Sequence, residues 1–169
     1  MVDDVTIRSC RRAMANLGQR GSEGRVSVFR YLVRAWITSG PYVLVAHESG
    51  ADNTFLPGGD IEHGEPAKDA LQREVMAKIG VLAEVGDLLG ACEAAREQDG
   101  RLYCELNLVF ACHLPGMDKN SVVRSREGNL EFHWVPKEDL ASINLTPEPM
   151  RKLAEVDTLR PAFWGSNLE

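Results

Sequence analysis

Apolar residues along this chain repeat every second position in some segments and about every fourth position in others. Residues 25–38 and 42–49 are rich in β-branched and aromatic side chains, and the turn sequence SGPY separates them. Residues 81–95 and 101–114 predict two more strands joined by the polar turn REQDG, and residues 130–136 predict a short one. The first half of the domain is therefore expected to be a β meander that leads into a glycine-rich loop.

Helical spacing follows this loop. Ala67, Leu71, Val75 and Ile79 repeat every four residues and predict the buried stripe of one helix, with Gly80 as its C-terminal cap. Pro66 suits the first helical position. Residues 137–143 predict a short helical turn, and residues 146–156 predict a second helix. Thr146 is placed to cap that helix. Strands and helices in this order predict an α/β (α+β) fold, a mixed β-sheet flanked by helices.

The first 24 residues form a separate segment by their pattern. Five apolar residues fall near helical spacing before the linker GQRGSEG: Val5, Ile7, Cys10, Met14 and Leu17. We expect an N-terminal helical arm and linker at 1–24, a main domain at 25–160 and a C-terminal tail at 161–169. The arm could dock on its own domain or form a homodimer. Phe163 and Trp164 in the tail suggest a similar docking role.

Composition bounds the class of protein. The chain has 169 residues, about one domain, with 44% apolar residues and a formal net charge of −6. This charge makes binding to nucleic acid or an anionic membrane unfavourable, and no apolar run is long enough to span a membrane. The cysteines at 10, 92, 104 and 112 form no C-x-x-C pair. With no signal peptide visible, we expect reduced thiols in a cytoplasmic protein.

The stretch LPGGDIEHGEPAKDALQREVMAKIGV, residues 56–81, combines a glycine loop with a charged helix. Gly58 and Gly59 let the backbone bend and let another group approach closely. Glu65 lies about two helical turns before Arg73, so the two side chains could pair and fix the loop to the helix. Glu74 follows Arg73, and positions 74, 77 and 78 share one side of the helix. Acids on that side would form an oxygen-ligand site for a hard cation such as magnesium.

This stretch resembles the box of the Nudix hydrolase superfamily, G-x5-E-x7-R-E-U-x-E-E-x-G-U, where U is aliphatic. The match starts at Gly59 and continues through Glu65, Arg73, Glu74, Val75, Gly80 and Val81. The segments on either side, over about residues 25–155, are similar to the family as well. The resemblance implies an α/β/α sandwich and metal-assisted attack of water on a nucleoside diphosphate that is linked to another group.

The box is degenerate at two positions. Ala77 and Lys78 stand where the family has two glutamates that, together with the residue matching Glu74, hold divalent cations. These changes shift the local charge by about three units, so a Mg or Mn ion is expected to bind poorly. Glu74 and Lys78 are also in the favourable i, i+4 order for an ion pair, worth about 0.2–0.5 kcal/mol.

Three functions stay open at this point. In the first, the chain is a pyrophosphohydrolase with weakened or altered metal dependence, in which Glu74 is the residual acid or base. Replacement acids would come from outside the helix: Glu62, Glu93, Glu97, Glu105 or Glu127. In the second, it binds a nucleotide-like phosphorylated ligand without cutting it, through Gly58, Gly59, Glu62 and Lys78. In the third, it is a partner-binding module that keeps only the fold.

A few residues outside the box are weaker candidates for ligand contacts. Arg30 and Arg34 lie on the same side of a predicted strand and could meet an anionic ligand, although exposed strand arginines are the simpler interpretation. Glu105 and Asn107 form a polar pair in the middle of another strand, which suggests that they face a cleft. Five others have a structural interpretation that is at least as good: His47, Glu48, His63, His133 and Trp134.

Overall fold

A computed structural model describes residues 27–155 and 163–166 of the chain. The predicted arm at 1–24 and most of the predicted tail lie outside these residues. The strand β8 (Phe163–Ser166) belongs to the predicted tail and pairs in parallel with β5 (Glu84–Gln98). Among the described helices, none has the length and hydropathy that crossing a lipid bilayer would require.

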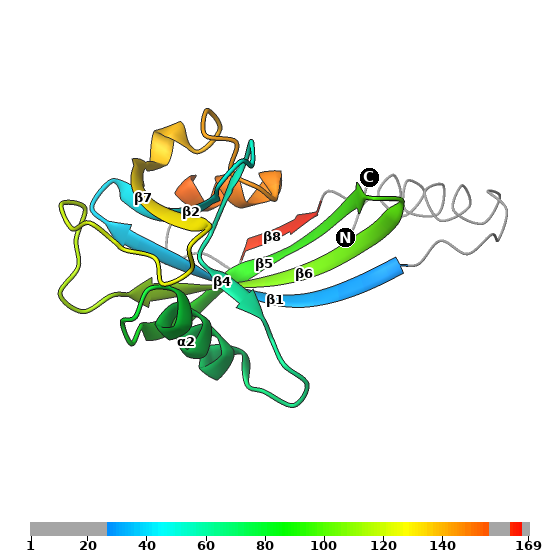
Figure 1. Ribbon diagram of the computed structural model, residues 1–169, viewed down its shortest axis with the longest axis horizontal. Coiled ribbons are helices and arrows are strands. Elements are labelled where there is room, and N and C mark those ends of the chain that lie inside the picture. Colours follow the sequence, from blue (N-terminus) through cyan, green and yellow to red (C-terminus); the bar gives the residue numbers. More distant parts are fainter. Residues whose placement is uncertain (1–26, 156–162, 167–169) are drawn as a thin grey trace, which may run out of the picture.

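The described residues form a strongly curled mixed sheet with few helices (Figure 1). Its order is β3-β2-β1-β6-β5-β8, where β1 spans Ser27–Ser39, β2 Tyr42–Glu48, β3 Thr54–Phe55 and β6 Arg101–His113. Two further strands pair at the sides, β4 (Gly58–Asp60) with β1 and β7 (Leu130–Pro136) with β2. This arrangement confirms the predicted α/β class.

The long strands β1 and β6 run in parallel and stay in register from Ser27–Leu102 to Ile37–Cys112. On its other side, β6 pairs antiparallel with β5, which precedes it in the chain. A two-residue turn at Asp99 and Gly100 joins the two strands. Both turn residues have positive φ, 52° and 72°, as a type I′ hairpin requires. The sequence therefore located this hairpin correctly, but β5 extends three residues into the predicted REQDG turn, to Gln98, while β6 begins at Arg101 as predicted.

Helix α2 (Ala67–Lys78) packs on one face of the sheet. The predicted stripe is confirmed: Leu71, Val75 and Ile79 are buried in a core cluster with Val33 and Phe110, and Ala67 packs at its edge. Pro66 is the N-cap residue and not the first helical residue. Gly80 follows the C-cap Ile79 with a left-handed φ of 84°.

The opposite face is covered by two short 3₁₀ helices, η1 (Lys137–Asp139) and η2 (Glu148–Glu155). Met150 and Leu153 of η2 join a second core cluster that includes Trp36 and Val109. The sequence predicted an α-helix capped by Thr146, and this was wrong on both points. The Thr146 hydroxyl instead donates to the Thr54 carbonyl, 3.2 Å away, so it fastens this segment to β3 and not to a helix end.

Candidate functional site

The glycine loop and α2 are joined by a continuous chain of ion pairs. Arg73 donates from Nε to Glu65 Oε1 at 2.8 Å and from Nη2 to Glu65 Oε2 at 2.9 Å. Arg73 Nη2 also donates to the Asp60 carbonyl at 3.0 Å, so the arginine ties β4 to the loop that follows it. The predicted clamp between Glu65 and Arg73 is therefore present, and it lowers the pKa of the Glu65 carboxyl to about 2.

Glu74 uses both carboxylate oxygens within this chain. Its Oε1 lies 2.5 Å from Arg73 Nη1, and its Oε2 lies 2.6 Å from Lys78 Nζ. Lys78 Nζ donates in addition to the Gly58 carbonyl at 2.7 Å. Two carboxylates and two cations alternate from Glu65 to Lys78, so the chain of ion pairs carries no net charge.

The two glycines allow this close packing of α2 on β4. A Cβ at Gly59 would overlap the Glu74 carboxylate, and a Cβ at Gly58 would overlap the backbone carbonyl of Val33. Gly58 also has a φ of 151°, which L-amino acids rarely adopt. The glycine pair is therefore needed to bring Lys78 to the Gly58 carbonyl and to seat Glu74 against the loop.

These residues do not fit a magnesium site of the kind the resemblance implies. Magnesium takes oxygen ligands at about 2.0–2.1 Å, usually including one or two carboxylates together with substrate phosphates. Only one carboxylate lies on this side of α2, and each of its oxygens is already paired with a cationic nitrogen. Across residues 27–155, the structure has no group of three or more Asp, Glu, His or Cys side chains that could hold a metal ion.

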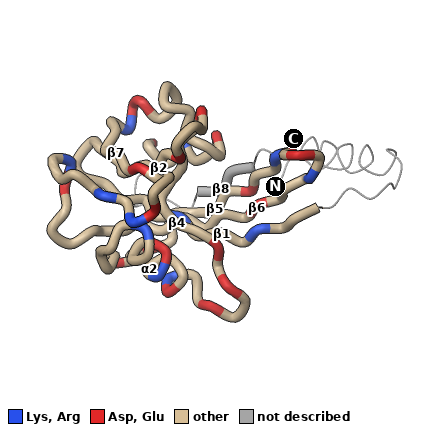
Figure 2. The backbone as a smooth tube through the Cα atoms, in the orientation of Figure 1, with Lys and Arg blue, Asp and Glu red and all other residues tan. Residues whose placement is uncertain are grey.

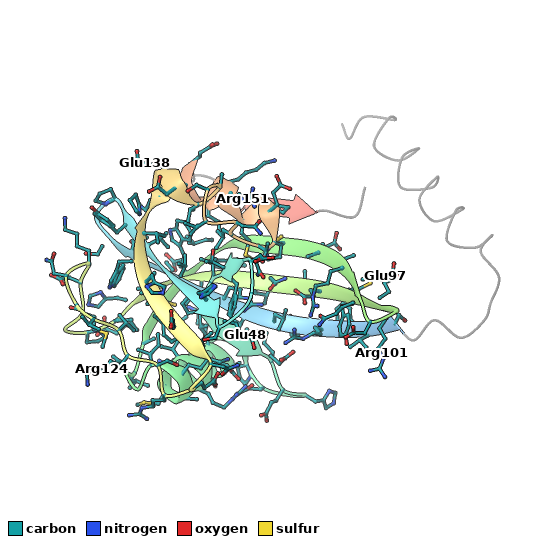
Figure 3. All side chains as sticks on the ribbon, turned by 45° about the horizontal axis from the view of Figure 1, so that its top comes forward. Glu48, Glu97, Arg101, Arg124, Glu138 and Arg151 are labelled. Carbon is teal, nitrogen blue, oxygen red and sulfur yellow. The ribbon has the colours of Figure 1, made fainter. Side chains whose placement is uncertain are left out.

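Next to this network lies an open cleft of about 920 Å³, a volume typical of small-molecule sites. Its floor is the face of β1 and β6 that carries Arg30, Arg34 and Glu105, and its walls come from several elements. Two of the wall residues, Glu48 and Arg151, are labelled in Figure 3. Wall residues include Gly59, Asp60, Glu74 and Lys78 on one side and Glu48, Phe55, Glu127, Asn144, Thr146 and Arg151 on the others.

Most charges in the cleft are paired. Arg30 binds Asp60 through two hydrogen bonds, of 2.7 and 3.1 Å. This contact lowers the pKa of the Asp60 carboxyl and raises that of Arg30. Glu105 is almost fully buried between Arg30 and Arg96, at 3.6 and 3.5 Å. These two arginines and two acids balance each other.

Arg34 is different. Its Nε donates to the Asn107 side-chain oxygen at 3.0 Å, its Nη1 donates to the Leu56 carbonyl at 3.3 Å, and its guanidinium lies over the Phe55 ring. Within the described part of the chain, no carboxylate forms an ion pair with it. Burial lowers the pKa of the Arg34 guanidinium, and the nearby Arg30 adds to this effect, whereas the carboxylates of Glu105, Asp60 and Glu74 act in the opposite direction. Arginine nevertheless stays charged in proteins, so the cleft holds a positive charge that no carboxylate of the described residues contacts within ion-pair distance.

The structure places the other predicted residues as follows. Arg30, Arg34, Glu48, Glu105 and Glu127 line the cleft, so Arg30 and Arg34 are not the exposed strand arginines of the simpler interpretation. Glu62 is exposed in the loop, where its amide donates to Glu65, and neither it nor Glu93 or Glu97 lines the cleft.

The remaining candidates lie outside the cleft, and the structure gives a structural role to some of them only. His47 hydrogen-bonds the Ala51 carbonyl at 2.9 Å, and His63 is exposed in the loop. Trp134 packs against the core under β7, while the neighbouring His133 is exposed beside Glu131. Asn107 is completely buried, and its contact with Arg34 is the feature that sequence reasoning missed. The polar pair that it forms with Glu105 in mid-strand was the available signal.

Comparisons with known proteins agree with this fold. The NUDIX domain family matches residues 28–156. No curated protein matches the chain significantly. Among solved structures, a NUDIX hydrolase from Nitrosomonas europaea superposes with a TM-score of 0.62 at 16% identity, covering 81% of this chain and 77% of that one.

Two further solved structures are similar over most of the chain. The E. coli ORF135 protein has 22% identity and a TM-score of 0.53, covering 78% of this chain and 91% of that one. An ADP-ribose pyrophosphatase from Streptococcus suis has 17% identity and a TM-score of 0.58, with 82% and 98% covered. Identities this low show the shared fold alone, but the family match spans most of the chain. The protein therefore belongs to the NUDIX domain family.

Proposed function

We propose that this NUDIX domain binds a phosphorylated, nucleotide-like ligand in the cleft beside α2, with protein cations in the place of a divalent metal. Family membership and two proteins of similar structure, an ADP-ribose pyrophosphatase and a UDP-X diphosphatase, support a nucleoside diphosphate as the ligand class. The size of the cleft is suited to such a molecule.

The observation that carries this proposal is that the Arg34 guanidinium has only neutral hydrogen-bond acceptors, Asn107 and the Leu56 carbonyl, among the described residues. Arg34 is partly buried, and a charge withdrawn from water without an ion-pair partner is costly. The acids Glu48, Glu127 and Glu148 also line the cleft, but all three are exposed, so solvent and salt screen them. A phosphate on the floor would supply the missing anion, and a guanidinium can donate to two of its oxygens at once.

Lys78 supplies the second part of the argument. Its ammonium is held between the Glu74 carboxylate and the Gly58 carbonyl, on the side of α2 where the family carries metal-binding acids. An ammonium has three donors, and only these two acceptors are assigned to it among the described residues. The third donor can reach a ligand phosphate without any metal between them.

A binding measurement tests the proposal directly. We expect ADP, UDP, ADP-ribose or UDP-glucose to raise the melting temperature in a buffer that contains a chelator, because a ligand stabilises the folded state by mass action. Arg34→Gln should weaken the affinity about 10-fold or more, which corresponds to the loss of one charge-assisted hydrogen bond.

The matched control is Arg101→Gln, at the tip of the β5–β6 hairpin (Figure 3). It removes the same charge from the molecule but lies outside the cleft, so the affinity should stay within about 2-fold. If none of the four probes binds at millimolar concentration, or if both variants bind equally well, the proposal is wrong.

Hydrolysis remains a second candidate, because two acids proposed from the sequence as replacements, Glu105 and Glu127, do line the cleft. Glu105 is held between two arginines, whereas Glu127 is exposed and could act on water. Monophosphate release from ADP-ribose or UDP-glucose that is lost in Glu127→Gln would favour this function. We expect the purified protein to bind these compounds without releasing product above background.

A further inference from the structure

The outer part of the long strands has an apolar face that the described residues leave open. Phe29 and Tyr31 of β1 are 68% and 39% exposed. Their register partners on β6 are Cys104 and Leu106, and directly paired residues point to the same side of a sheet. Leu102 lies on this side as well, two register pairs further out. We call these five side chains the outer face.

The outer face continues the surface that α2 covers. Val33 and Ala35, the next residues of β1 on the same side, are fully buried in the core cluster with Leu71 and Val75 of α2. Figure 1 shows that β1, β5 and β6 extend well past α2, so the helical layer ends while the apolar strand face goes on. Figure 2 shows that charged residues gather around α2 and at the β5–β6 turn, with few along the outer part of β1.

We propose that the N-terminal segment, residues 1–24, docks on the outer face of its own chain as an amphipathic helix and extends the layer that α2 begins. Two residues separate this segment from β1, and Phe29 lies only five residues after its end. In a helix, Ile7, Cys10, Met14 and Leu17 would share one face at spacings of three, four and three residues.

The dimensions match. A helix from Ile7 to Leu17 is about 15 Å long, and strand residues 27–31 span about 13 Å. The linker GQRGSEGR, followed by Val26, gives nine residues that can extend about 30 Å. This is enough chain to reverse direction and lay the helix along the strand that follows it.

The distribution of charge also favours docking of the N-terminal segment on the outer face. Residues 1–26 hold five arginines and three acids, while the whole chain has 19 basic and 25 acidic residues. The remaining residues therefore carry 14 basic and 22 acidic side chains, a net charge of −8, against +2 for residues 1–26, which are the segment and the two residues after it. Glu93 and Glu97 of β5 lie on the side of the sheet that carries the outer face, through their register partners Leu106 and Leu102. Electrostatic attraction between the segment and the domain would therefore stabilise docking in addition to the burial of apolar surface.

Two cysteines provide the test in the full chain. Cys104 belongs to the outer face and Cys10 to the apolar stripe of the segment, so docking brings the two thiols together. Burial raises the pKa of Cys92 to about 11 and of Cys112 to about 12, so neither should compete for a thiol reagent near pH 7. A short bis-maleimide should link Cys10 to Cys104 within one chain, and peptide mass spectrometry of the monomer band would identify the link.

Labelling with a monofunctional maleimide separates docking from chance contact. Met14→Asp puts a charge on the apolar stripe and should raise the labelling rate of Cys104 several-fold. Asn16→Asp adds the same charge on the opposite side of the predicted helix and should leave the rate unchanged. Equal Cys104 labelling in both variants would overturn the proposal. So would a Cys10–Cys104 link found only in the dimer band, which would assign the outer face to a second copy of the chain.

Discussion

At the scale of single residues, the charges on α2 satisfy each other. Glu74 sits between Arg73 and Lys78, and Glu65 completes the set on the loop. The spacing of these residues in the sequence was enough to predict both the Glu65–Arg73 pair and the Glu74–Lys78 pair, because each is local to one helix and the loop before it.

Restoring the missing acids should create a cation site. The double variant Ala77→Glu, Lys78→Glu removes the ammonium from Glu74 and places three carboxylates on one side of α2. We expect this variant to bind magnesium in calorimetry, and we expect the unchanged protein to give no heat of binding. Lys68→Glu, a charge change elsewhere on the helix, is the control. A double variant that still fails to bind magnesium would mean that the loop geometry differs from a metal site as well.

The clamp on the glycine loop should depend on pH. The folded pKa of Glu65, about 2, lies below its ordinary value of 4.5, so its stabilising effect is complete above pH 4.5 and is lost as the pH falls toward 2. Glu65→Gln should therefore be less stable than the unchanged protein at pH 7, and the gap should narrow between pH 5 and pH 2.5. Urea unfolding at several pH values measures this. A gap that stays constant would show that the carboxylate does not hold the loop.

Arg34 could not be assigned from the sequence in the same way. Its partner Asn107 is 73 residues away, and the two meet only because β1 and β6 pair in parallel. A parallel pair has no short connecting turn to mark it in the sequence. The sequence showed that Arg34 was a candidate, but only the register of β1 and β6 shows that its side chain contacts a neutral amide.

At the scale of elements, the loop and α2 behave as one unit, and Gly58 joins that unit to β1. Gly58→Ala would force a Cβ into the Val33 carbonyl and strain the backbone. We expect a loss of about 1–3 kcal/mol of unfolding free energy and weaker nucleotide binding, since Arg34 follows Val33 directly.

Gly64 provides the comparison for this substitution. It also has positive φ, 80°, but a Cβ there would meet open space. Gly64→Ala therefore measures the backbone strain without the overlap and should keep nucleotide affinity. Denaturant titration and calorimetry compare the two variants, and equal losses in both would mean that close packing at Gly58 is unimportant.

The C-terminal elements show the limit of reading helices from local pattern. Residues 146–156 carry helix-forming side chains, yet the structure has a 3₁₀ helix, because Thr146 is bonded to β3 and Arg151 bonds back to the Leu145 carbonyl. Tertiary contacts decide the geometry here. The helix at 67–78 was predictable because its stripe, its preceding proline and its following glycine all agree.

At the scale of the whole molecule, the glycine motif and strand pattern were sufficient to predict the family, and the match over residues 28–156 confirms it. The cleft could not be predicted, because its walls come from segments as far apart as Arg30 and Arg151. The molecule combines a family fold with a charge arrangement that replaces the expected acids on α2 by an internal ion-pair network.

The most direct test of this account is the dissociation constant of ADP or ADP-ribose, measured by calorimetry in a chelator and again with excess magnesium. We predict binding that is at least as tight in the chelator, with about a 10-fold or greater loss in Arg34→Gln. Binding that requires magnesium, or that is unaffected by the loss of Arg34, would contradict the account.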